Sequence, residues 1–174
     1  HNKRIIKVPG GWDRELASPF GYGTYKLTVL LPEPKPEGTR QLAVQTSIIR
    51  SSHTLFVNGH KVGGSGEPGA DASVTRPLVL PYFAAISAEG GRAEIVVHAA
   101  NYAYAKGGGI FQDIAFGSRE AVLRSYMIQN AQNAALMGVF LICGLFFFML
   151  YGFRRQNREL LYFGLFFSMS LLFW

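Results

Sequence analysis

The sequence predicts an all-β jelly-roll or β-sandwich exterior domain followed by transmembrane α-helices. Two observations predict this fold class. Residues 134–153 read AALMGVFLICGLFFFMLYGF, twenty residues without a charge. The first 118 residues instead read as short alternating strands separated by glycine and proline, which is typical of sandwiches. We therefore expect a domain at 1–118 that residues 119–174 hold in a membrane.

The apolar stretch 134–153 predicts a transmembrane helix. Twenty residues at about 1.5 Å each match a hydrocarbon core of roughly 30 Å. Apolar side chains occupy every angle of this helix, which disfavours an amphipathic core helix. Its internal position excludes a cleaved signal peptide. Because no proline or glycine lies between Arg119 and Gly138, we expect one linker helix over 119–153 that continues into this first span.

The loop at 154–159 predicts the orientation of the chain. The loop has three basic residues, Arg154, Arg155 and Arg158, and a single acid, Glu159. The positive-inside rule therefore assigns the loop to the cytoplasm and residues 1–118 to the outside. A second apolar stretch follows at 160–174. Its fifteen residues are too few to cross comfortably, so we expect a truncated second span that continues beyond Trp174.

Alternation of apolar and polar residues predicts seven strands in the exterior domain. Asn58-Gly59 between two short runs predicts a two-residue hairpin turn, because both positions accept positive φ. Several strands with turn residues between them predict a sandwich or jelly roll. The expected strands are Tyr25–Leu31, Leu42–Ile48, Thr54–Val57, Lys61–Gly63, Leu78–Leu80, Ala93–Ala99 and Ile110–Phe116.

Composition excludes several classes of protein. The net charge is +6, but the basic residues are scattered, so no nucleic-acid partner is expected. Cys143 is the only cysteine and lies within the first span, so the exterior domain has no disulfide framework. The four histidines lack metal-ligand spacing, and no nucleophile or phosphate-binding motif is present. We expect no cofactor, no metal and no catalytic site in these residues.

Aromatic side chains with hydrogen-bonding neighbours in or beside the predicted loops indicate a ligand site. Such pairs suit sugars and other amphipathic small molecules. Three alternatives stay open: Trp12 and Tyr25 fill the core, Asn101 caps backbone groups, and Arg50 with His53 is solvated. The candidate ligand-binding residues are Trp12, Tyr22, Arg50, His53, Asn101 and Tyr104.

Small residues four apart in the outer half of the first span permit close helix approach. The candidate contacts are Ala131, Ala135 and Gly138, and a homodimer through them is one of the possible uses.

Three segments, taken in order, resemble a known family. They are GYGTYKLTVLLP at 21–32, LFVNGHKVGGSGEPG at 55–69 and EIVVHAANYAYAKGGGI at 94–110. They are similar to the galactose-binding-like jelly roll of the sugar-binding domain in beta-galactosidases and beta-glucuronidases. The same fold forms the exterior module of bacterial seven-transmembrane receptors with diverse intracellular signalling modules, and RRQNRELLYFGLFF at 154–167 resembles that family's first cytoplasmic loop and second helix.

The resemblance implies a bacterial sensor in the plasma membrane. Its exterior sandwich would bind a carbohydrate or related small molecule, and a cytoplasmic output module such as a histidine kinase would follow the membrane helices. No catalytic residue carries over. The alternative hypothesis is a membrane-anchored interaction module whose sandwich docks a protein partner without a small ligand. An enzyme acting in the exterior domain is disfavoured by the missing catalytic groups.

Overall fold

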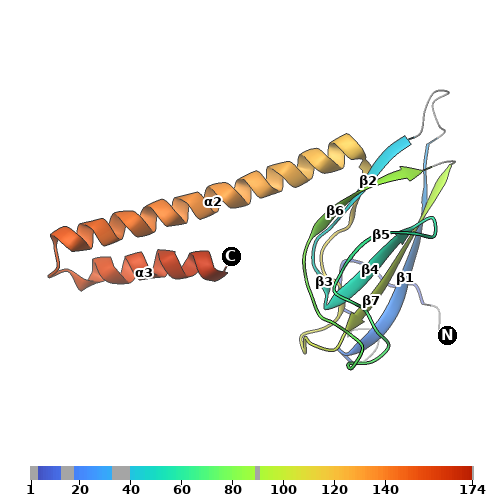
Figure 1. The fold of residues 1–174 in the computed structure, drawn as a ribbon, viewed down its shortest axis with the longest axis horizontal. Helices are drawn as coiled ribbons and strands as arrows, with labels where there is room; N and C mark the ends of the chain where they lie inside the picture. The colour runs from blue at the N-terminus through green and yellow to red at the C-terminus, as the bar shows by residue number, and fades with distance from the viewer. Residues whose placement is uncertain (1–3, 13–17, 33–39, 89–90, 174) are drawn as a thin grey trace. The chain divides into compact units, whose positions relative to one another are not determined.

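The computed structural model describes residues 4–12, 18–32, 40–88 and 91–173. It divides into two compact units, His1–Arg124 and Ser125–Trp174. Trp174, the end of the predicted second span, lies outside the described residues. Figure 1 shows the strands of the first unit and the two helices.

The larger sheet has four antiparallel strands in the order β1-β7-β4-β5. Strand β7 (Arg92–Asn101) is central and pairs along its whole length with β1, from Asn101 opposite Gly21 to Arg92 opposite Leu30. Its other edge pairs with β4. The remaining bounds are β1 Gly21–Leu30, β4 Ser52–Val57 and β5 His60–Ser65.

Two smaller sheets complete the first unit. Strand β2 (Arg40–Thr46) lies between β6 (Tyr82–Ala88) and β9 (Ala115–Ser118), and both pairings are antiparallel. Strands β3 (Ile49–Arg50) and β8 (Gly109–Ile110) form a two-residue pair. This short pair positions the site described below.

The core lies between the four-stranded and three-stranded sheets, so the first unit is a β-sandwich. Alternate residues of β2, β4 and β7 point inward, as the pleat of a strand requires. In Figure 1, β2 and β6 lie across from β4, β7 and β1. The buried cluster draws on both sheets and consists of Trp12, Leu42, Val44, Ile49, Leu55, Val57, Ile86, Ile95, Val97, Ala99 and Ile110.

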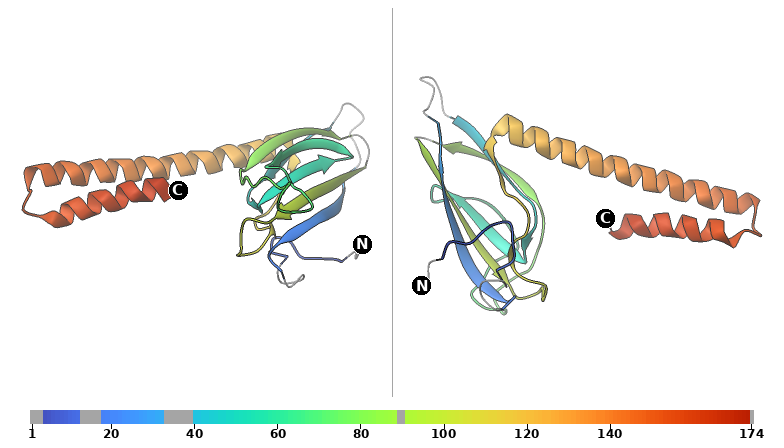
Figure 2. Two further views of the ribbon diagram at one scale, coloured as in Figure 1. Left: turned by 60° about the horizontal axis from the view of Figure 1, so that its bottom comes forward. Right: turned by 180° about the vertical axis from the view of Figure 1, so that it is seen from behind.

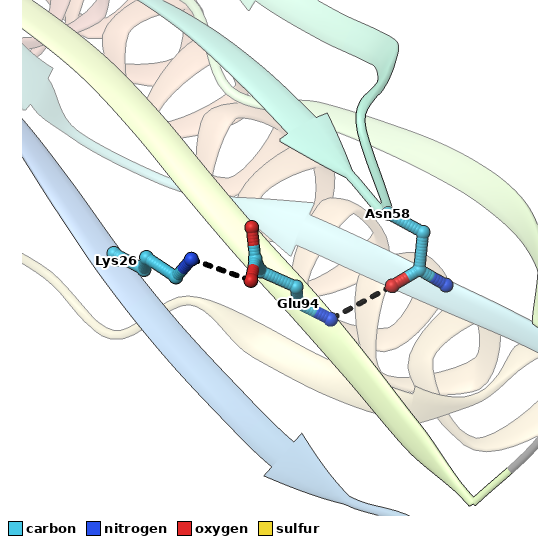
Figure 3. Close-up of polar contacts among 3 residues, drawn as sticks. All are labelled: Lys26, Asn58 and Glu94. Atoms are coloured by element: carbon cyan, nitrogen blue, oxygen red, sulfur yellow. Dashed lines mark hydrogen bonds and ion pairs between the residues drawn. The ribbon is translucent and has the colours of Figure 1, made fainter.

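The β4–β5 hairpin turns at the predicted Asn58-Gly59 pair. Both residues have positive φ, 50° and 81°, as the turn requires. Asn58 also joins the hairpin to β7, because its Oδ1 accepts the Glu94 backbone N–H at 2.8 Å. The Glu94 carboxylate in turn pairs with Lys26 of β1 at 2.6 Å (Figure 3), so this residue of the central strand contacts both β1 and the β4–β5 turn.

Two of the predicted strands are wrong. Leu78–Leu80 belongs to no strand, and the strand in this region is β6, which begins at Tyr82. The reason is that Ser65 takes the place of a strand partner: its Oγ donates to Leu78 O and accepts from Leu80 N, both at 2.9 Å. The predicted run Ile110–Phe116 is split between β8 and β9, because its two ends pair with different strands, β3 and β2.

Helix α2 spans Arg119–Phe153 and starts directly after β9, and helix α3 spans Arg158–Phe173. Among the described residues, α2 alone is long and apolar enough to cross a membrane, since α3 has 16 residues. In the second unit the two helices lie side by side and antiparallel (Figure 2). Phe147 stacks on Phe163 and Phe167, with ring centroids 5.3 and 5.7 Å apart.

The close helix contact uses glycines other than the predicted small residues. A Cβ on Gly164 would lie 2.8 Å from the Phe148 ring, and one on Gly144 would lie 3.4 Å from Ser168 Oγ. At Gly138 the same test finds no atom within 4 Å. Ala131 and Ala135 are exposed in this single chain.

Candidate ligand site at the loop end of the sandwich

An arginine between two aromatic rings is the most distinctive feature of the loop end of the sandwich. Arg50 on β3 pairs with Gly109 on β8, and Phe111 follows that strand. The Arg50 guanidinium carbon lies 4.3 Å from the centroid of Phe111 and 5.8 Å from that of Tyr104. Both distances are within cation–π range. The structure therefore brings together two predicted site residues, Arg50 and Tyr104.

No carboxylate of the described residues pairs with Arg50. Its Nη1 donates to the Lys106 carbonyl at 3.5 Å, the long limit of a hydrogen bond. In the part of the chain that the structure describes, the ion pairs found are Lys26–Glu94 and Arg76–Glu67. Arg50 is partly buried, so it combines restricted solvation with free donor capacity.

Asn101 fixes the loop that carries Tyr104. Its Oδ1 accepts the Tyr104 N–H at 3.0 Å, and its Nδ2 donates to the Tyr104 carbonyl at 2.8 Å. Nδ2 also donates to Pro19 O at 2.7 Å. Asn101 is fully buried at the end of β7. It thus positions the loop as a buried polar group with its partners satisfied.

Trp12 supports the same loop from inside the core. Only 4% of its surface is exposed, and its Nε1 donates to Pro19 O at 3.1 Å. Its backbone N–H donates to Gly108 O at 3.0 Å, and its ring stacks on Tyr25 with centroids 6.5 Å apart. Gly108 has to be glycine here, since a Cβ would lie 2.5 Å from the Trp12 ring.

His53 lies inside the sandwich and is separate from this loop. It is 1% exposed on β4, between Ala99 and Ser65 of the neighbouring strands, and it stacks on Tyr82 with centroids 5.6 Å apart. Neither ring nitrogen has a hydrogen-bond partner among the described residues. Burial disfavours the charged ring and lowers the pKa of His53 to about 4.

Tyr22 lies on the outer face of the four-stranded sheet. It is 61% exposed near the start of β1, and by strand alternation it shares its face with Lys26. Tyr102, just beyond β7, donates from its hydroxyl to Ala70 O. This bond ties the 102–108 loop to the 66–81 loop and closes the end of the sandwich. No contact between Tyr22 and Arg50 is present among those found.

A hollow lies along the edge strand β1 of the four-stranded sheet, away from the arginine cluster. It has a volume of about 510 Å³ and extends inward to the core residues Ile95 and Ile110. Leu27 of β1 lines it and is 59% exposed. The hollow contains Tyr25 but none of the six predicted ligand residues.

Phe111 is the site residue that sequence reasoning missed. Its place beneath Arg50 depends on the two-residue β3–β8 pair, which is too short to leave a periodic pattern. The one available signal was an aromatic residue directly after the Gly107–Ile110 run. Among the described residues, no group of three or more His, Cys, Asp or Glu side chains is arranged to hold a metal ion.

The chain is similar to parts of several solved glycosidases. They are a GH2 beta-galacturonidase from Eisenbergiella tayi bound to galacturonate (16% identity, 64% of this chain and 20% of that chain, TM-score 0.48), an FMN-binding beta-glucuronidase from Faecalibacterium prausnitzii (15%, 65% and 19%, 0.49) and a beta-glycosidase from Bacteroides vulgatus (16%, 66% and 16%, 0.46). The chain spans about a fifth or less of their length, and at these identities the likeness concerns the fold alone. No family model and no curated protein matches the sequence.

Proposed function

We propose that this chain is the extracytoplasmic sensory part of a bacterial multi-pass membrane receptor. The observation that carries the proposal is the combination of an aromatic–arginine cluster at the loop end with a membrane-length helix that follows the last strand directly. A small ligand, with carbohydrates as the first class to test, would contact Arg50 and Tyr104. The sandwich would be a galactose-binding-like jelly roll, as the sequence resemblance implies.

The start of α2 supplies a route by which the sandwich could act on the membrane helices. Ser118 of β9 pairs with Leu42 of β2, and Arg119 Nη1 donates to Gln41 Oε1 at 3.3 Å. Val122 is 5% exposed, so the first turn of the helix is packed against the sandwich. A shift in β2 would therefore move the helix start. For signalling, the ligand must favour one helix arrangement over another.

The arginine-rich turn between α2 and α3 supports a cytoplasmic position for that turn and an exterior position for the sandwich. The full receptor would contain further spans and a cytoplasmic output module such as a histidine kinase. Self-association through Ala131, Ala135 and Gly138 is an additional proposal, supported by the exposure of the two alanines and by the open space at Gly138.

A thermal-shift screen tests the ligand part of the proposal. The full chain with Trp174→Phe, held in lipid nanodiscs, would report through Trp12 alone as it melts, because the sequence has two tryptophans. We expect monosaccharides, sugar acids or cell-wall fragments to raise the melting temperature of the sandwich. Tyr104→Ala should weaken that shift, and His60→Gln, at the exposed start of β5, serves as the matched control. The absence of any stabilisation across a broad library would contradict the small-ligand proposal.

The hollow along β1 favours a second candidate, a docking module for a protein partner. Strand β1 is an edge strand, and its apolar Leu27 and Leu30 are 59% and 78% exposed. An extended polypeptide could add to that edge by backbone hydrogen bonds and fill the hollow with side chains. Leu27→Lys would then abolish partner binding in cross-linking experiments while leaving small-ligand binding at the loop end unchanged.

A further inference from the structure

We propose that the ligand of the loop end carries a compact oxyanion, a carboxylate or a phosphate, and that Arg50 is the residue that binds it. This inference rests on the proposed function only for the position of the site. It goes further in naming the chemistry that the site selects.

The charge distribution around Arg50 favours an anion. The segments 40–66 and 95–112, which carry Arg50, Tyr104 and Phe111, contain no aspartate or glutamate, and the nearby Asp113 lines the hollow along β1 and forms no ion pair with Arg50 among those found. The acids of the adjoining 66–81 loop are already engaged: Glu67 pairs with Arg76 at 3.1 Å, and Asp71 accepts from the Ser73 and Val74 backbone N–H groups at 2.8 and 3.3 Å. An incoming anion therefore meets a cation without a competing carboxylate partner among the described residues.

The geometry of the guanidinium favours an oxyanion over a neutral hydroxyl. Arginine has five N–H donors in a planar fork that matches the two oxygens of a carboxylate or phosphate. One of its N–H groups is directed at Lys106 O, at the long distance of 3.5 Å, so most of the fork remains available. The contact with the Phe111 ring at 4.3 Å restricts the plane of the fork, which reduces the entropy lost on binding.

The aromatic neighbours add selectivity for the rest of the ligand. Phe111 is partly buried and limits the water around the guanidinium, which strengthens its interaction with charge. Tyr104 is 44% exposed, and its backbone is fixed on both sides by Asn101. Its ring offers a surface for the apolar face of a sugar ring or an aromatic ring. An acid with a ring therefore fits better than an acid alone.

Titration of the full chain in detergent micelles tests the inference. With ¹⁵N-arginine labelling, the Nε–Hε signal of Arg50, assigned by its loss in Arg50→Gln, is followed at constant ionic strength. The probes are matched pairs, glucuronate against methyl glucoside and benzoate against benzyl alcohol, with inorganic phosphate as a third anion. We expect saturable shifts of this signal only with the anions, and none with methyl glucoside or benzyl alcohol. Comparing glucuronate with benzoate then shows whether the site prefers a sugar acid or an aromatic acid.

Substitutions then separate anion binding from general charge. Arg50→Lys keeps the charge but loses the fork and the Nε–Hε signal, so its affinity is compared with the wild type by isothermal titration calorimetry, and we expect about tenfold weaker binding or more. Arg92→Gln removes an exposed charge at the opposite end of β7 and should leave the affinity unchanged. The inference is overturned if none of the three anions gives a saturable shift, or if Arg50→Lys binds as tightly as the wild type.

The same titration distinguishes this inference from the proposed function. Equal binding of methyl glucoside and glucuronate would leave a small-ligand site at the loop end but would contradict the oxyanion preference. Anion binding at Arg50 that leaves the hydrogen exchange of α2 unchanged would support the oxyanion preference and would count against the sensory role.

Discussion

The sandwich and the helical unit bury opposite kinds of residue. In the sandwich the interior holds branched aliphatic side chains such as Leu55 and Val44, both fully buried. Among the described residues of the helical unit, the buried positions are the glycines Gly144 and Gly164. Many large apolar side chains there face outward, with Ile142 exposed to 68%.

In the proposed membrane setting, each unit would bury the residues that its own surroundings favour. Removing apolar area from water stabilises the sandwich, at roughly 25 cal/mol per Å². Helices surrounded by hydrocarbon gain little from hiding leucine, so close packing of small residues becomes the main contribution. An apolar side chain thus has a different energetic role in the two halves of the chain, and mutations should reveal it.

The largest contrast is expected from the same substitution made in each unit. Leu55→Ala removes a fully buried side chain from the sandwich core, and we expect a loss of about 2–5 kcal/mol in the free energy of unfolding. Leu145→Ala, at a position 61% exposed on α2, should cost under about 1 kcal/mol in nanodiscs. Denaturant unfolding measures both losses, with Trp12 fluorescence as the probe of the sandwich and far-UV circular dichroism as the probe of the helices. Equal losses would contradict the assignment of separate solvents.

The second effect is specific to the sandwich and depends on pH. Unfolding returns the pKa of His53 from about 4 to about 6.5, so below pH 6.5 the unfolded chain binds a proton that the folded chain excludes. The contribution of His53 to the free energy of unfolding is therefore fully present above pH 6.5. It is lost as the pH falls from 6.5 to 4, by roughly 3 kcal/mol at most. His53→Leu should remove this part of the slope, whereas His60→Gln should keep it. A His53→Leu variant with the wild-type slope would show that other groups cause it.

The third effect is specific to the helical unit. Gly164→Ala introduces a Cβ 2.8 Å from the Phe148 ring, and overpacking of this kind costs about 1–3 kcal/mol. Gly152→Ala meets no atom within 4 Å and should be neutral or slightly stabilising. Unfolding by titration with a denaturing detergent compares the two variants. A harmless Gly164→Ala would argue against the α2–α3 contact.

The smallest effect is expected at the surface of the sandwich. Lys26 and Glu94 form an ion pair at 2.6 Å, but their side chains are 59% and 44% exposed. A double-mutant cycle with Lys26→Gln and Glu94→Gln should give a coupling energy of about 0.2–1 kcal/mol that decreases with added salt. A coupling well above this range would mean that the pair is more shielded from solvent than the structure indicates.

Much of the sandwich could be predicted because its strands alternate clearly, as in β1 and β2. The Leu78–Leu80 strand was predicted wrongly because an apolar run between Pro77 and Pro81 resembles a strand locally. Its backbone instead bonds to the Ser65 side chain and to Ser51 O, thirteen or more residues away in the sequence. A local pattern carries no information about such a long-range hydrogen bond.

The candidate site was predictable only in its residue types. Arg50 and Tyr104 were identified because charged and aromatic residues near turns often bind ligands. The roles of Trp12 and Asn101 in positioning the loop depend on their common acceptor, Pro19 O, which only the folded chain brings to both. Phe111 was missed because its contact with Arg50 arises from the two-residue β3–β8 pair.

Cysteine labelling in intact bacteria tests most directly whether the two units occupy different surroundings. In a Cys143→Ala background, Ser87→Cys on β6 and Gln156→Cys between the helices are both exposed positions. With a membrane-impermeant maleimide applied from outside, we predict labelling of Ser87→Cys in intact cells and of Gln156→Cys only after permeabilisation. Labelling of Gln156→Cys in intact cells, or protection of Ser87→Cys, would contradict an exterior sandwich held by a membrane-spanning α2.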